Sequence, residues 1–144
     1  MSKVLVLNGP NIQRLGMREP DVYGSTDYNS LVGILKSEGS AIGLEVEIRQ
    51  TDSEAQMISW LHEAVDQQID VIINPAAFTH YSYGVRDAAV QVTKCGKRLI
   101  EVHLSNPHTR ETFRHTSVIS GVATGVIAGF GINSYILALI QLSK

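Results

Sequence analysis

Val4-Leu5-Val6-Leu7-Asn8 is an apolar run that stops at a hydrogen-bonding side chain, and the chain repeats this pattern twice. Residues 71–74 end in Asn74 and residues 99–103 end in His103. Short runs that are apolar on both faces are typical of parallel strands covered by helices. The ligand crevice of such a sheet lies beyond the carboxyl ends of its strands. The pattern therefore predicts that Asn8, Asn74 and His103 gather at one site.

Strand and helix signals alternate along the rest of the chain. Val46 and Ile48 alternate with charged residues, which favours an edge strand, and residues 125–129 are expected to form a fifth strand. Apolar residues keep helical spacing in four segments, residues 31–42, 53–65, 85–92 and 132–142. Repeated strand-helix order implies a parallel sheet with right-handed crossovers. We therefore expect one α/β domain over residues 1–144, a flavodoxin-like three-layer sandwich with a five-stranded parallel sheet and helices on both faces.

Two of the expected helices carry further signals. Ser53 and Gln56 have capping-box spacing. The segment 132–142 is apolar nearly all round, and a helix tolerates this only where more than one face is covered. Self-association is the resulting hypothesis, and a sedimentation measurement that finds a monomer would contradict it.

The composition of the chain limits the kinds of partner that it is expected to bind. The 144 residues are 44% hydrophobic with a formal net charge of -2, and they contain neither a basic block nor an apolar stretch of about 18 residues. We therefore expect a small-molecule substrate, with no nucleic acid and no membrane as partner. A single cysteine, Cys95, fits a reduced cytoplasmic setting, and the direct entry into the first strand predicts no signal peptide.

The loop after the first strand, residues 9–24, is longer than the two to six or so residues that usually join strand and helix. Within it, a turn at Glu19-Pro20 can bring Arg18 and Tyr23 together. Lowering a phenol pKa from about 10 to about 7 takes roughly 4 kcal/mol. A unit charge about 4 Å away contributes on the order of 4 kcal/mol at an effective dielectric of about 20. The pair is either an activated phenolate base or a surface tyrosine packed on a solvated arginine.

Glu101 and His103 lie two apart on an expected strand, so both point to the same face. A carboxylate beside an imidazole favours imidazolium, which makes His103 a candidate general acid, with a purely structural pair as the alternative. The following turn, residues 104–107, can aim backbone N–H groups at an anion. Arg110 and Arg114 are four apart and are expected to share a helical face, where one can bind a polar substrate and one is a solvated or interface charge.

Two further residues, Asn74 and His80, have two interpretations each, and a third, Asp87, has one. Asn74 offers a donor and acceptors to a ligand carboxylate or hydroxyl, or else caps its own loop. His80 is a ligand contact or a helix cap. Asp87 by itself reads as a solvated charge.

Taken together, these segments resemble type II 3-dehydroquinate dehydratases over essentially the whole chain. The matching segments are Leu7-Asn8-Gly9-Pro10-Asn11, Arg18-Glu19-Pro20, Tyr23-Gly24, Asn74-Pro75, Thr79-His80, Arg86-Asp87, residues 100–106 and Phe113-Arg114-His115.

The resemblance implies a shikimate-pathway lyase that converts 3-dehydroquinate to 3-dehydroshikimate through an enolate, without cofactor or metal. Tyr23 would be the base, Arg18 its activator, and Asn11 would place a water on the enolate oxygen. His103, oriented by Glu101, would protonate the departing hydroxyl. Chorismate and aromatic amino acid biosynthesis and quinate breakdown are both open to such an enzyme.

The same resemblance assigns the binding residues. Asn74 and the backbone of Leu104 and Ser105 would hold the substrate carboxylate, and His80 and Arg114 would contact ring hydroxyls. Asp87 would reach a neighbouring subunit's site, in trimers that assemble into a homododecamer.

Some positions depart from the family pattern and put affinity and assembly in question. Ala76 stands where a glycine is common, and the other departures are Tyr81, Tyr83, Thr116 and Ser134.

Two other function classes compete with an enzyme. Residues 129–134 nearly imitate a dinucleotide-binding turn, but Ser134 replaces the third glycine. A flavodoxin-like cofactor carrier would need a phosphate cradle that residues 9–24 lack, and visible absorbance of the purified protein would reveal one. An interaction module would leave the Arg18/Tyr23 and Glu101/His103 pairs without purpose. No clustered motif among the histidines suggests a metal site.

Overall fold

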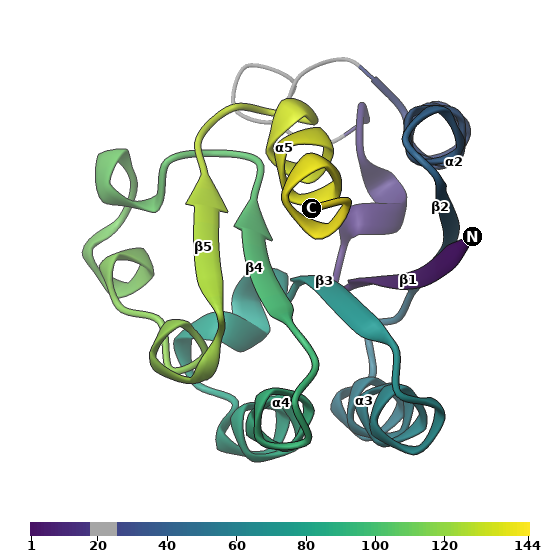
Figure 1. The fold of residues 1–144 in the computed structure, drawn as a ribbon. Coiled ribbons are helices and arrows are strands. Elements are labelled where there is room, and N and C mark those ends of the chain that lie inside the picture. The colour runs from purple at the N-terminus through teal and green to yellow at the C-terminus, as the bar shows by residue number, and fades with distance from the viewer. Residues whose placement is uncertain (18–25) are drawn as a thin grey trace.

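A parallel sheet forms the centre of the chain in the computed structural model, which describes residues 1–17 and 26–144. The strand order is β2-β1-β3-β4-β5 (Figure 1). This is the flavodoxin-like order, with the β2 strand at an edge as predicted. The strands are β1 Ser2–Asn8, β2 Leu44–Gln50, β3 Asp70–Asn74, β4 Leu99–His103 and β5 Gly125–Ala128.

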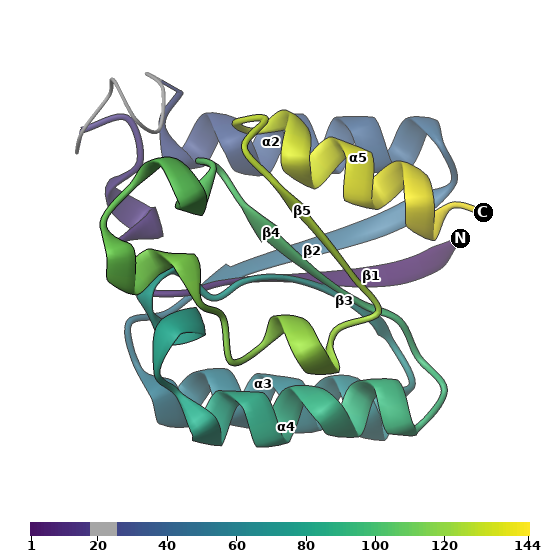
Figure 2. The ribbon, with the colours of Figure 1, turned by 90° about the vertical axis from the view of Figure 1, so that its left-hand side faces the viewer.

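Helices cover both faces of the sheet, which confirms the predicted three layers. Figure 2 shows α2 (Tyr28–Ala41) and α5 (Asn133–Leu142) on one side and α3 (Glu54–Gln67) and α4 (Tyr83–Lys94) on the other. Short 3-10 helices lie in the connections: η1 Ile12–Arg14, η2 Ala76–His80, η3 Pro107–Thr109, η4 Thr112–His115 and η5 Ser120–Val122. None of the helices in the described residues is both long and apolar enough to cross a bilayer.

Two hydrophobic cores fill the spaces between these layers. Successive strand residues point to opposite faces, so neighbouring residues of one strand join different cores. In β1, Val4 and Val6 pack with α2 and α5, whereas Leu5 and Leu7 pack with α3 and α4. This division explains why the strands are apolar on both faces, and it lets one strand carry polar groups to either face at its carboxyl end.

Local chemistry sets the helix ends. Ser53 caps α3, because its Oγ accepts the Gln56 backbone N–H at 3.2 Å. The reciprocal half of the predicted capping box is absent, since the Gln56 side chain accepts from the Thr51 hydroxyl at 2.5 Å instead. That hydroxyl in turn accepts the Ser53 N–H at 3.0 Å. The helix end is therefore tied to the end of β2.

The predicted closing helix is α5, and it packs one face into the core. Tyr135, Ala138 and Leu139 are fully buried, whereas Leu137 and Ile140 are exposed in the single chain. Self-association through the exposed face stays a prediction.

Gly9, directly after β1, lies against the backbone that follows β3. Its N–H donates to the Asn74 carbonyl at 2.8 Å, and a Cβ at this position would lie 2.4 Å from the Pro75 carbonyl oxygen. Backbone atoms cannot give way as a flexible side chain can. This contact fixes the start of the loop after β1 beside the end of β3.

We predict opposite effects for two glycine substitutions. Gly9→Ala forces backbone apart and is expected to lower the free energy of unfolding by about 1–3 kcal/mol. Gly33→Ala, in α2 with no atom within 4 Å of the added Cβ, is expected to raise it by up to about 1 kcal/mol. Urea unfolding of both variants measures this, and equal effects at the two positions would contradict the close approach at Gly9.

Candidate active site

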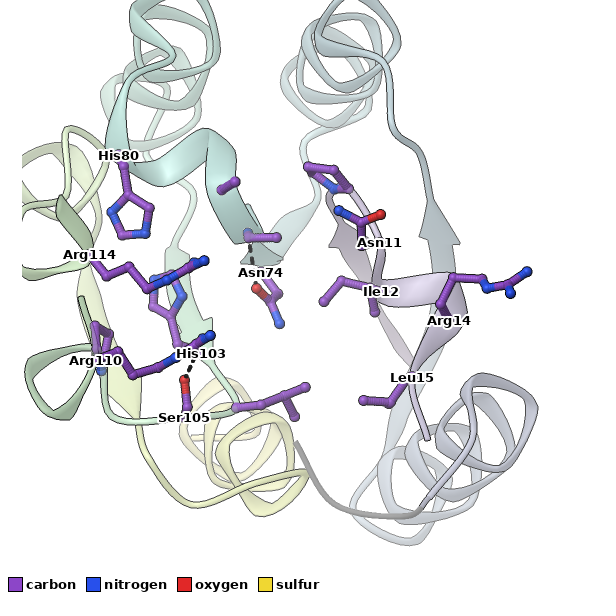
Figure 3. Close-up of a pocket in the computed structure, with 15 residues that line it drawn as sticks. Asn11, Ile12, Arg14, Leu15, Asn74, His80, His103, Ser105, Arg110 and Arg114 are labelled. Carbon is purple, nitrogen blue, oxygen red and sulfur yellow. Dashed lines mark hydrogen bonds between the residues drawn. The ribbon is translucent and has the colours of Figure 1, made fainter. Parts of the chain in front are cut away.

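A cavity opens beyond the carboxyl ends of β1, β3 and β4, where the sequence predicts the site (Figure 3). It is lined by the loop after β1, by the end of β3 with η2, and by the end of β4 with the segment that follows. The described lining residues are Pro10, Asn11, Ile12, Arg14, Leu15, Asn74, Ala76, Ala77, His80, His103, Leu104, Ser105, Pro107, Arg110 and Arg114. Asn74 and His103 therefore line the same cavity, as predicted.

Asn8 does not join them, and that part of the prediction is wrong. Its side chain is fully buried and is not among the described lining residues. The amide nitrogen donates to the Arg49 carbonyl at 3.3 Å, and the amide oxygen accepts from the Tyr135 hydroxyl at 2.6 Å. Because neighbouring groups use both ends of the amide, Asn8 supports the site from behind.

Asn74 does cap its own loop, the alternative interpretation of this residue. Its Oδ1 accepts the Ala76 N–H at 3.1 Å, and its Nδ2 donates to the Tyr135 hydroxyl at 2.8 Å. The side chain nevertheless reaches the cavity wall (Figure 3). Each Asn Nδ2 carries two hydrogens, so one N–H remains in addition to the bond with Tyr135.

Glu101 and His103 share a face of β4, as predicted, and their side chains are hydrogen-bonded through Glu101 Oε2 and His103 Nε2. Glu101 has no solvent exposure, whereas His103 lines the cavity. The other ring nitrogen of His103, Nδ1, takes no part in this bond. The carboxylate therefore orients an imidazole that a ligand can reach.

Three hydroxyl groups also surround the Glu101 carboxylate. The Thr79 hydroxyl donates to Oε2 at 2.8 Å and the Ser120 hydroxyl to Oε1 at 2.7 Å. Ser117 Oγ lies 3.2 Å from Oε1 and 3.1 Å from Oε2. Sequence reasoning missed the role of all three, because no periodic signal links residues 117–120, or Thr79 in the connection after β3, to β4.

These contacts lower the pKa of Glu101. Burial by itself raises this pKa, but hydrogen bonds from His103, Ser120 and Thr79 and the charge of the imidazole outweigh it. Glu101 is therefore ionised at neutral pH although it is buried.

Cationic side chains occupy the same side of the cavity. Arg114 and Arg110 both line it, although only Arg114 lies in η4, so the predicted shared helical face is wrong. Arg114 Nε donates to Glu111 at 3.0 Å and its guanidinium lies 4.6 Å from the centre of the Phe113 ring. Arg110 Nη1 lies 3.4 Å from Ser105 Oγ. Arg14, on the opposite wall, is directed away from these groups (Figure 3).

His80 lines the cavity and is not a cap, because Ser82 caps α4. Its Nδ1 bonds to the Thr116 carbonyl at 2.8 Å. Burial, together with repulsion from Arg114 and His103, lowers the pKa of His80. The ring is therefore mainly neutral at neutral pH and can exchange hydrogen bonds with hydroxyl groups.

The remaining predicted residues divide into three groups. Asn11, Leu104 and Ser105 line the cavity, and the Asn11 N–H donates to Asp52 at 3.0 Å. Asp87 is exposed on α4, is bonded to Arg86 at 2.9 Å and is not among the described lining residues. Arg18 and Tyr23 lie outside the described residues.

Two departures from the family pattern have structural consequences. Ala76 lines the cavity with φ 51°, a left-handed conformation that favours glycine, so its methyl group is held at a cost in strain. Ser134 is fully buried, and its Oγ accepts the Phe130 N–H at 3.2 Å. Tyr81 and Tyr83 are exposed, and Thr116 contributes its carbonyl to His80.

What the arrangement can do follows from its charges. No Asp or Glu is among the described lining residues, which include Arg110 and Arg114. The cavity therefore suits an anion and offers an imidazole for proton transfer. Over residues 1–17 and 26–144, no three or more His, Cys, Asp or Glu side chains are grouped to hold a metal ion.

Comparison with known proteins identifies similar chains. The family model described as dehydroquinase class II matches residues 2–143. A 3-dehydroquinate dehydratase of Salinispora tropica is 55% identical over 141 residues, 98% of this chain and 96% of that one. The crystal structure of a type II dehydroquinase from Propionibacterium acnes superposes with a TM-score of 0.96 at 50% identity, covering 99% of this chain and 97% of that one. The crystal structure of a type II dehydroquinase from Butyrivibrio crossotus superposes with a TM-score of 0.95 at 42% identity, covering 99% of this chain and 98% of that one.

The lowered pKa of Glu101 predicts an acid-dependent stability. A depressed carboxyl pKa stabilises the fold above the ordinary value of 4.5, and this contribution is lost as pH falls through the lower folded value. Glu101→Gln is expected to lower the free energy of unfolding by about 1–3 kcal/mol at about pH 7, because hydroxyl donors then face an amide. Urea unfolding measured between about pH 7 and about pH 3 is expected to show the two proteins converging in acid. A difference that grows on acidification would contradict this explanation.

Proposed function

The chain belongs to the class II dehydroquinase family and is a 3-dehydroquinate dehydratase, a lyase of the shikimate pathway, and on that premise we propose a base and an acid for its reaction. Tyr23 removes a proton from the carbon beside the ketone, and the electron pair moves onto the ketone oxygen to give an enolate. As the enolate collapses, the bond to the neighbouring carbon's hydroxyl breaks. His103 gives that hydroxyl a proton, water leaves, and 3-dehydroshikimate is formed.

The observation that carries the acid role is the buried carboxylate behind His103. Glu101 is withdrawn from solvent, ionised and bonded to His103 Nε2, so the ring cannot turn freely. A fixed imidazole at the cavity wall can hold a proton for the leaving hydroxyl. Glu101 is thus a positioning residue for the acid.

The base role rests on chemistry and on the family pattern. An arginine beside a phenol stabilises phenolate without losing its own proton, so Arg18 is the proposed activator of Tyr23. Asn11, on the cavity wall opposite His103, is the proposed holder of the water at the enolate oxygen (Figure 3).

Binding of the substrate carboxylate is assigned to Asn74 and the backbone N–H groups of Leu104 and Ser105, all on the cavity wall. His80, mainly neutral, and Arg114 are assigned to ring hydroxyls. Since these groups are donors or cations, they match an anionic polyol.

We further propose a homo-oligomer, a dodecamer built from trimers, in which Asp87 reaches the site of a neighbouring subunit. Its exposed carboxylate on α4, away from its own cavity, suits that role. Sedimentation as a monomer at assay concentration would contradict the assembly. A reducing cytoplasm suits the single cysteine, Cys95.

His103→Ala is expected to reduce kcat by a factor of about 100 or more with a smaller change in KM, because the leaving hydroxyl loses its proton donor. Absorbance of the conjugated enone formed from 3-dehydroquinate measures the rate. A variant that only raises KM would show that His103 binds the substrate without acting as the acid.

Tyr23→Phe is expected to reduce turnover by a factor of about 1000 or more while the free energy of unfolding stays within about 0.5 kcal/mol. Loss of the hydroxyl removes the proton acceptor and deletes a single oxygen from the side chain. The same enone assay and urea unfolding measure both quantities. Retention of a tenth of the wild-type rate would exclude Tyr23 as the base.

A further inference from the structure

A phenol from the closing helix lies directly behind the cavity wall. Tyr135 of α5 is fully buried and its hydroxyl touches two amides from neighbouring strands. The hydroxyl is 2.6 Å from Asn8 Oδ1 at the end of β1 and 2.8 Å from Asn74 Nδ2 at the end of β3. Asn8 and Asn74 are also register partners in the sheet. The three side chains form a continuous buried relay.

Backbone groups at both ends of this relay fix the direction of every hydrogen bond. At one end the Arg49 carbonyl can only accept, so Asn8 must present Nδ2 to it and Oδ1 to the phenol. At the other end the Ala76 N–H can only donate, so Asn74 must present Oδ1 to it and Nδ2 to the phenol. If either amide were turned over, a donor would face a donor or an acceptor would face an acceptor.

The phenol satisfies both amides with a single proton. It donates that proton to Asn8 and accepts from Asn74, so each of its contacts is complementary. Burial raises the pKa of the Tyr135 phenol far above its ordinary value, so the proton remains on the oxygen at any pH of interest. In the described part of the chain, every buried side-chain nitrogen and oxygen has a hydrogen-bond partner, and this holds for the atoms of the relay as well.

We propose that Tyr135 is a positioning residue for the dehydration, because together with the Ala76 N–H it holds the Asn74 amide so that an N–H, and not the carbonyl oxygen, faces the substrate. This rests on the proposed assignment of Asn74 to the substrate carboxylate. An N–H donor at the wall selects an acceptor such as a carboxylate, whereas a reversed amide would repel it. The closing helix thereby contributes to recognition without touching the ligand.

The test compares Tyr135→Phe and Asn74→Ala, singly and together, by the enone assay. Tyr135→Phe is expected to raise KM about tenfold while kcat changes less than about twofold, because binding in the ground state and the transition state weakens equally. In the Asn74→Ala background the same change is expected to have almost no effect on KM, because the phenol acts through that amide. Additive effects on KM would overturn the proposal.

A control separates positioning from stability. Ala138→Gly weakens the same helix at a fully buried position without removing the relay, and its KM is expected to equal that of the wild type. A KM for Ala138→Gly that rises as much as for Tyr135→Phe would show a general effect of helix destabilisation and overturn the proposal.

Asn8→Leu approaches the relay from its other end and serves if Tyr135→Phe does not fold. It is close in shape to asparagine but removes the acceptor for the phenol proton, so KM is expected to rise as in Tyr135→Phe. An unchanged KM in whichever variant folds would overturn the proposal. An unchanged KM in Asn74→Ala would instead refute the assignment of Asn74 to the carboxylate. A raised KM in Asn74→Ala together with a wild-type KM in Tyr135→Phe would refute only the role of Tyr135.

Discussion

A carboxylate without contact with water must be met by donors, and Glu101 imposes this requirement on the segments around the cavity. Thr79 supplies a hydroxyl from η2, and Ser117 and Ser120 supply theirs from the segment before β5. Breaking such a set leaves a buried charge without compensation, which costs more than any single bond contributes. The requirement therefore fixes two connections relative to β4 and, through the same carboxylate, fixes the ring of His103.

The cavity is assembled from both faces of the sheet. Leu99 packs with α3 and α4, so Glu101 and His103, two and four residues later, point to that face. Ile72 packs with α2 and α5, so Asn74 points to the opposite face, where Tyr135 lies. One buried network thus orients the imidazole on the side of the sheet covered by α3 and α4. Another orients the amide on the side covered by α2 and α5, and Figure 2 shows these two pairs of helices on opposite sides of the sheet. The carboxyl edge of the sheet is where side chains from both networks line one cavity.

Strand periodicity made much of this predictable. The three apolar runs located β1, β3 and β4, and a spacing of two placed Glu101 and His103 on one face. The hydroxyls around Glu101 were not predictable, because their approach depends on how connections fold in three dimensions. Asn8 was misplaced for a related reason: a polar strand end faces a ligand only if no buried neighbour uses it first. Tyr135 carried a signal, because it is the one tyrosine in a largely apolar helix.

The distribution of charge explains how a cavity that suits an anion can have a carboxylate directly behind its wall. Arg110 and Arg114 line the cavity, whereas Glu101 has no exposure and lies behind the imidazole it orients. Coulomb interactions weaken with distance, and an anion in the cavity faces guanidinium groups on the wall, whereas the Glu101 carboxylate is buried behind the imidazole. The buried position lets Glu101 orient the His103 ring while the described cavity wall carries arginines and no carboxylate. An exposed carboxylate at the same strand end would orient the ring equally well but would repel an anion in the cavity.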